Sequence, residues 1–160
     1  MQILRYALLL LVAMILQSNW PYAFDLHGMR PDLLLIVALF SGLRNGVVFG
    51  MLLGAIGGFF QDINSPQDLG LNTFLKSTIG FTVGSIRKRI AYDNNIVVAL
   101  LLFGVSLLHD LMFYIGSSAM ILEEVPNFML RYGVGRAVFT IIFGVSFAYV
   151  ITLRNRILID

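Results

Sequence analysis

The side chains that could carry chemistry in this chain lie inside long apolar stretches. His109 and Asp110 are adjacent in one of them, and an imidazole beside a carboxylate is the usual material of general acid–base catalysis. Neighbouring residues on a helix point about 100° apart, so these two cannot easily act on one atom. The sequence has no cysteine, no nucleophile with an orienting base, no metal-ligand spacing and no phosphate-binding loop. We therefore predict no enzymatic activity and neither a metal nor another cofactor.

A set of ionisable side chains within or next to the apolar stretches predicts a polar network. A charge at the centre of a bilayer costs about 2.5–3.5 kcal/mol on the insertion scale, so such groups should face inward and pair. Acids and bases roughly balance in this set, which favours a structural network over a site for a ligand, ion or proton. Asp110 is expected to pair with Lys76 or with Arg136, and both pairings are open. The predicted members are Asp32, Asp62, Lys76, Asp110, Arg131 and Arg136.

One enzymatic alternative is an intramembrane aspartic hydrolase, similar to the lipoprotein signal peptidase, which has a similar length. Asp62 and Asp110 would then form its catalytic pair. The Asn/Asp motifs that surround the catalytic aspartates of that family are missing from this chain. We therefore do not favour this alternative.

The composition indicates which elements must position these side chains. Of 160 residues, 58% are hydrophobic and 12% are charged, and the mean hydropathy is +0.86. Soluble domains carry about 25% charged residues. The chain is therefore predicted to be a single all-α integral membrane domain over residues 1–160, in contact with the lipid bilayer. No basic and aromatic pattern of a nucleic-acid-binding protein is present.

A transmembrane helix needs about 20 mostly apolar residues. The second candidate below is short, and a single tilted helix over residues 31–61 would leave five spans instead of six. The turn signal Arg44-Asn45-Gly46 favours a break, and a helix of about 45 Å is too long for ordinary tilt. We therefore predict a bundle of six transmembrane helices, at residues 3–19, 31–43, 45–61, 71–86, 96–117 and 127–153.

The distribution of charge predicts the orientation. With six spans and both termini cytoplasmic, most basic residues face the cytoplasm and most acidic residues face outward, as the positive-inside rule requires. Arg5 and the following apolar run also fit a signal peptide, but the stretch Ser18-Asn19-Trp20-Pro21 has no small-residue cleavage site. Contact with anionic headgroups is conceivable for the basic loop, although a role in topology suffices. The predicted cytoplasmic basic residues are Arg5, Arg44, Arg87, Lys88, Arg89, Arg154 and Arg156.

Glycines recur at a spacing of about four residues. Small residues at this spacing let helix backbones approach closely in membranes. We favour packing within this one bundle, and an interface with a partner or with a second copy of the chain is the alternative. The glycines are Gly42, Gly46, Gly50, Gly54, Gly57, Gly58, Gly80 and Gly84.

Between Pro31 and about Arg87, the chain resembles the rod shape-determining protein MreD family. The similarity rests on Pro31-Asp32-Leu33-Leu34, on the glycine-rich stretch that ends in Phe59-Phe60-Gln61-Asp62, and on Leu69-Gly70-Leu71-Asn72. Gly80 and Gly84 then precede the basic loop. The two C-terminal helices carry no motif of this family.

The resemblance implies a non-enzymatic scaffold of the bacterial cytoplasmic membrane that helps coordinate peripheral peptidoglycan synthesis during elongation. The expected partner is MreC, which has one transmembrane helix. Through MreC the chain would be linked to RodA with its transpeptidase, and indirectly to MreB. The family is also thought similar in fold to the S component of energy-coupling-factor transporters. The alternative function is therefore a substrate-binding S component of a vitamin transporter, with Lys76, Asp110 and Arg136 as ligand-site candidates.

Overall fold

The computed structural model describes residues 2–19, 29–91, 94–117 and 122–157. These segments form helices and short turns, and they contain no strand. Trp20 and Pro21, from the stretch considered above for a signal-peptide cleavage site, and the side chains of Arg154 and Arg156 lie outside what is described. The helices are α1 (Gln2–Ser18), α2 (Leu33–Asn45), α3 (Val47–Ile63), α4 (Leu71–Ile86), α5 (Asn95–Gly116), α6 (Val125–Phe128) and α7 (Val134–Ile157).

The last two helices form one continuous rod. A π-helical turn over Met129–Gly133 joins α6 to α7 without a break. This rod corresponds to the sixth predicted helix, and it begins at Val125 rather than at residue 127. Every predicted helix begins within two residues of the observed start. The all-helical architecture therefore follows the apolar stretches of the sequence closely.

The chain turns sharply between α2 and α3. Gly46 has a φ of +94°, which L side chains rarely adopt, and its N–H still donates to the carbonyl of Gly42 at 3.0 Å. A new helix begins at Val47. The alternative of one continuous helix over residues 31–61 is therefore wrong.

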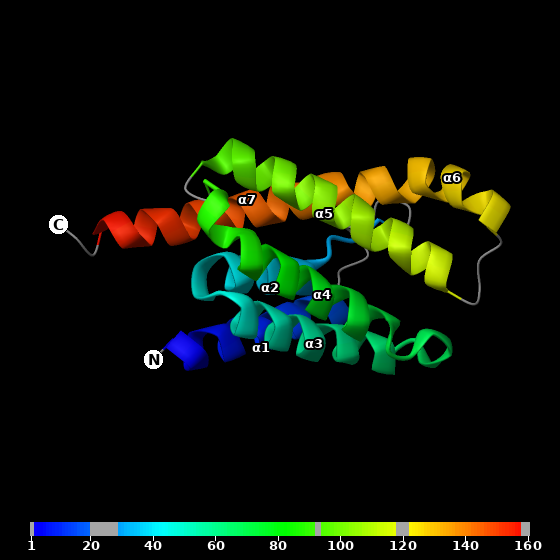
Figure 1. Ribbon diagram of the computed structural model, residues 1–160, viewed down its shortest axis with the longest axis horizontal. Coiled ribbons are helices and arrows are strands. Elements are labelled where there is room, and N and C mark those ends of the chain that lie inside the picture. Colours follow the sequence, from blue (N-terminus) through cyan, green and yellow to red (C-terminus); the bar gives the residue numbers. More distant parts are fainter. Residues whose placement is uncertain (1, 20–28, 92–93, 118–121, 158–160) are drawn as a thin grey trace.

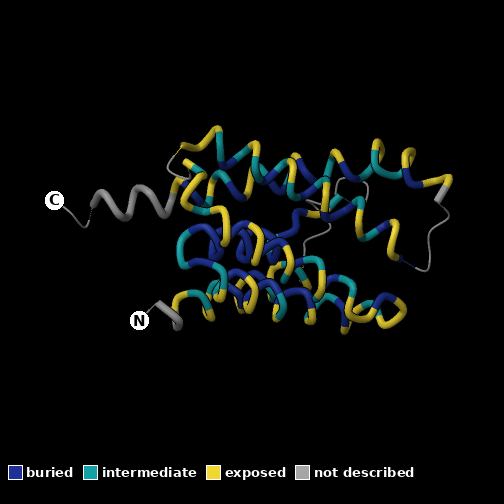
Figure 2. The backbone as a smooth tube through the Cα atoms, in the orientation of Figure 1, coloured by how far each residue is buried: buried dark blue, intermediate teal, exposed yellow. Residues whose placement is uncertain are grey.

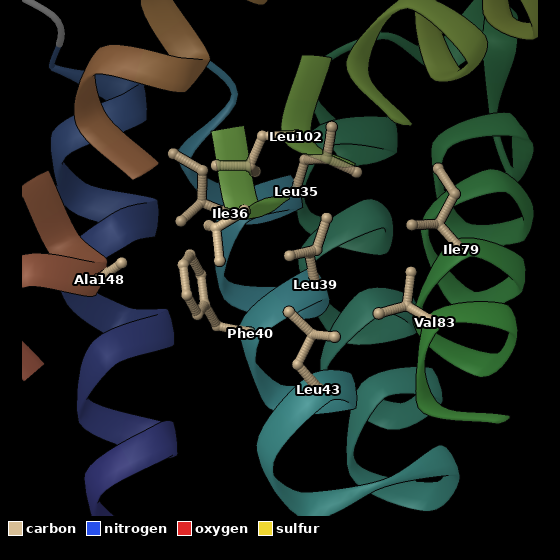
Figure 3. Close-up of a cluster of buried hydrophobic side chains, with 10 residues drawn as sticks. Leu35, Ile36, Leu39, Phe40, Leu43, Ile79, Val83, Leu102 and Ala148 are labelled. Carbon is tan, nitrogen blue, oxygen red and sulfur yellow. The ribbon is translucent and has the colours of Figure 1, made fainter. Parts of the chain in front are cut away.

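Helix α2 is the central element of the molecule (Figure 1). Each residue from Leu34 to Leu43 is buried. One side of α2 packs against Ile79 and Val83 of α4, Leu102 of α5 and Ala148 of α7, as Figure 3 shows. Another side packs against α1 and α3. Because α2 is surrounded by protein, its 13 residues need not match the thickness of a membrane.

Helices α3 and α4 approach each other through glycines. A Cβ atom at Gly58 would lie 2.6 Å from the Cα of Thr73, and one at Gly84 would lie 2.7 Å from the Cα of Val47. At Gly50 and Gly54, a Cβ would meet the backbone of α4 in the same way. Backbone contact of this kind has no room for a side chain, so these helices form a rigid pair.

The remaining helices expose large apolar side chains on their outer faces. Figure 2 shows the exposed residues on the outside of the bundle and the buried ones along α2. Leu11, Phe59, Phe74 and Leu100, from four different helices, are each at least half exposed. Two helices, Asn95–Gly116 and Val125–Tyr149, are long and apolar enough to cross a membrane. Such outer faces suit a lipid surrounding and not water.

Candidate functional site

A buried ion pair lies where α2 begins. Lys76 comes from α4, its side chain is fully buried, and its ammonium group forms an ion pair with Asp32. The other carboxylate oxygen of Asp32 accepts a hydrogen bond from the backbone N–H of Leu35 at 2.9 Å. Asp32 is therefore both the N-cap of α2 and the counter-ion of Lys76.

His109 of α5 connects this ion pair to a second one. Its Nε2 lies 3.2 Å from the Lys76 ammonium nitrogen, and its Nδ1 lies 3.2 Å from Asp110 Oδ1. Because an ammonium group only donates, Nε2 must accept and the Nδ1–H must donate to Asp110. His109 is thus fixed as a neutral bridge between a cation and an anion.

Arg136 of α7 completes the network. Its Nη1 lies 3.4 Å from Asp110 Oδ1 and 3.5 Å from the hydroxyl of Tyr114. Thr140, one turn further along α7, donates to the Arg136 carbonyl at 2.8 Å and accepts from the Asp32 N–H at 3.1 Å. Two acids and two bases from four helices are therefore joined in one chain of contacts. The geometry pairs Asp110 with Arg136, while Lys76 pairs with Asp32.

Two of the residues predicted for the network have other surroundings. The carboxylate of Asp62 accepts from the N–H groups of Asn72 at 3.0 Å and Thr73 at 2.9 Å, and from the Thr73 hydroxyl at 2.6 Å. It therefore caps the start of α4, where Gly70 offers no side-chain cap. Arg131 lies exposed on the π-helical turn. Neither side chain has a described contact with the network.

The predicted network left out His109, Tyr114 and Thr140, although His109 is one of the ionisable side chains in the apolar stretches and Tyr114 shares a helix face with Asp110. The sequence gives His109 no partner in the network, and its direction on the helix argues against a catalytic pair with Asp110. The same direction lets it reach Lys76 on another helix. The buried face of α5 could have indicated this role for His109. Residues that lie four apart on this helix are all buried, and His109 is buried next to them: Leu102, Ser106, Asp110 and Tyr114.

A polar cavity of about 390 Å³ opens next to this network. His109 and Arg136 belong to both the network and the cavity wall. The Oε1 atom of Gln61 is buried there without a hydrogen-bond partner among the described residues. None of the described wall residues is acidic. The wall consists of Gln17, Ser18, Arg30, Phe60, Gln61, Asn64, Ser65, Asn72, His109, Phe113 and Arg136.

The carboxylates of Asp62 and Asp110 lie in separate surroundings. No cluster of three or more His, Cys, Asp or Glu side chains that could hold a metal ion occurs among the described residues. Asp62 is bound by the start of α4, whereas Asp110 is bound by His109 and Arg136. Each carboxylate thus has separate partners, and the pair that an aspartic hydrolase requires is not assembled.

Fold and site together define a helical protein that has an internally balanced charge network and, among its described residues, two helices long and apolar enough to cross a membrane. A family model described as rod shape-determining protein MreD matches residues 1–154 of the 160-residue chain. The chain belongs to the MreD family, which gives it a role in rod shape determination. The match includes α5 and α7, where no motif had been recognised. Neither the curated proteins nor the solved structures gave a match.

Proposed function

We propose that this protein is a non-enzymatic scaffold of the cell-elongation machinery that binds MreC and helps coordinate peripheral peptidoglycan synthesis. The family match over residues 1–154 is the observation that carries this proposal. The charge network supports it, because its four charged groups are paired with one another, Lys76 with Asp32 and Arg136 with Asp110.

The proposed topology is six transmembrane segments with both termini in the cytoplasm. The start of α1 and the end of α7 lie at the same end of the bundle, on the left in Figure 1. Arg44, at the end of α2, and Arg87–Arg89, after α4, lie at this end too. Basic residues on one side of a membrane favour a cytoplasmic position for that side.

The surface that binds MreC is proposed to lie outside the glycine-rich contact. Gly50, Gly54 and Gly58 face the backbone of α4, and Gly57 faces Leu10 and Leu34. Gly42, Gly80 and Gly84 also belong to contacts within the bundle, and Gly46 lies under Arg87. A partner helix could reach these positions only by displacing the parts of the bundle that cover them. The same argument applies to a homodimer, so we favour the apolar outer faces for either contact.

A second candidate function, the S component of a vitamin transporter, is favoured by the polar cavity. Its wall combines the cations Arg30 and Arg136 with the rings of Phe60 and Phe113. Such a wall suits a small ligand with an anionic group and a flat apolar part. A fold similar to S components is part of this proposal.

Purification of the tagged protein from its native membrane in mild detergent, with mass spectrometry of bound proteins, tests both functions. Recovery of MreC, with or without RodA and its transpeptidase, is expected. Recovery of a transporter's ATPase and coupling subunits would instead favour the S component. Absence of MreC, together with normal cell shape after depletion of the protein, would reject the scaffold.

A further inference from the structure

A second cavity, of about 420 Å³, lies at the opposite end of the molecule from the charge network. It is formed where α2 and α4 end, and the walls are Leu43, Arg44, Arg87, Lys88 and Ile90. Three of these five side chains are cations, and none of the described wall residues is an acid. Like charges that face one cavity repel one another unless an anion lies between them.

Arg87 is held in place by the end of α2. Its Nη1 donates to the carbonyl oxygen of Arg44 at 3.3 Å. Its guanidinium group also lies against Gly46, where a Cβ atom would be only 3.0 Å from Nη1. The position of one cation at the cavity is therefore fixed by the fold and not by solvent.

Arg44 has a hydrogen-bond donor that the described residues leave unused. Its Nε atom is buried and has no acceptor in the part of the chain that is described. The amide nitrogen of the neighbouring Asn45 is buried without a partner as well. A buried donor without an acceptor costs about 1–3 kcal/mol of folding free energy. A ligand that supplied an acceptor to the end of α2 would therefore stabilise the folded protein.

The described acidic side chains are too far away to supply this acceptor to Arg44. Asp32 begins the helix that Arg44 ends, which separates their backbones by roughly 18 Å at ~1.5 Å per residue. Asp62 closes α3 and Asp110 lies near the end of α5, both at the far side of the bundle (Figure 1). Among the described residues, this end of the molecule therefore carries basic side chains and no acid.

We propose that this cavity binds a phosphate group, supplied by an anionic phospholipid of the membrane surface. Guanidinium groups match phosphate oxygens in shape and charge. Basic pockets between transmembrane helices at the cytoplasmic side bind anionic headgroups, and Leu43 and Ile90 offer an apolar rim beside the cations. This site is separate from the proposed scaffold function and does not depend on it.

The test is thermal unfolding of the purified full-length protein in detergent, with phosphatidylglycerol or phosphatidylcholine titrated in. Phosphatidylglycerol is expected to raise the Tm at lower concentration than phosphatidylcholine does. One basic side chain contributes about 1 kcal/mol of attraction to an anionic surface, so Arg44→Gln and Lys88→Gln should each weaken this preference about fivefold. Because Lys88 is exposed, Lys88→Gln is expected to fold normally. It therefore still tests the lipid preference if Arg44→Gln fails to fold.

Arg89→Gln is the matched control, because Arg89 is exposed, carries the same charge and does not line the cavity. It should retain the preference for phosphatidylglycerol. A parallel titration with sodium phosphate distinguishes the source: stabilisation that depends on Arg44 would identify a soluble phosphate as the ligand. Equal losses in all three variants, or no effect of either lipid or phosphate, would overturn the proposal.

Discussion

Lys76 is the residue on which the interior of this protein depends most directly. Its ammonium group is fully buried, and Asp32 is its direct acidic partner among the described residues. Removing one member of a buried ion pair leaves an uncompensated charge, which typically costs about 3–5 kcal/mol. Removing both members often costs much less.

We therefore predict that Lys76→Met lowers the stability of the purified protein by about 3–5 kcal/mol, and that Asp32→Asn restores part of the loss in the double variant. Thermal unfolding of both single variants and of the double variant in detergent measures this coupling. Arg131→Gln is the control, because Arg131 is exposed and lies outside the network. Additive effects of the two substitutions would contradict the pairing.

Sequence reasoning could predict that charges in the bundle pair, but not which of them do. Lys76 and Arg136 were equal candidates for Asp110, because the choice depends on how α4 and α7 stand around α5. Asp32 forms its contacts across 44 and 108 positions of sequence, with Lys76 and Thr140 respectively. Periodicity within a helix carries no information about such distant partners.

At the scale of the helices, the sequence was more informative. The apolar stretches predicted each helix, and the turn signal before Gly46 predicted the break between α2 and α3. The π-helical turn at Met129–Gly133 was not predictable, because no proline or change of periodicity marks it inside the sixth predicted helix. The role of Asp62 as the cap of α4 also escaped prediction, since ten residues separate it from Asn72.

The contact between α3 and α4 leads to a prediction with an internal control. A Cβ atom at Gly80 would collide with the backbone of Gly50, and neither backbone can move without separating the helices. Gly80→Ala should therefore lower the Tm strongly. Gly104 lies in α5 with nothing within 4 Å of the position of its Cβ. Gly104→Ala should leave the stability unchanged or raise it by up to about 1 kcal/mol, because alanine favours the helix.

Thermal unfolding of both glycine variants, at equal detergent concentration, measures the difference. If Gly80→Ala and Gly104→Ala shift the Tm equally, the close approach of α3 and α4 does not hold the bundle together. A loss of MreC binding in Gly80→Ala with an unchanged Tm would instead assign this glycine to the partner interface.

At the scale of the whole molecule, the described acids are confined to one end. The described acids lie with the network and the loops beside it, whereas Arg44, Arg87, Lys88 and Arg89 lie at the other end. This arrangement follows from the sequence, because alternate loops carry opposite charge. From this arrangement, the positive-inside rule predicts that the basic end lies in the cytoplasm, as in the proposed topology.

The absence of cysteine from the chain allows a direct test of this orientation. Lys88 and Glu124 are exposed and lie at opposite ends of the molecule. In intact cells or spheroplasts, a membrane-impermeant maleimide should label the Glu124→Cys variant. It should label the Lys88→Cys variant only after the membrane has been permeabilised. Labelling of both variants after permeabilisation is the control for reactivity. Labelling of Lys88→Cys alone in intact cells would invert the topology, and with it the leaflet proposed for the phosphate site.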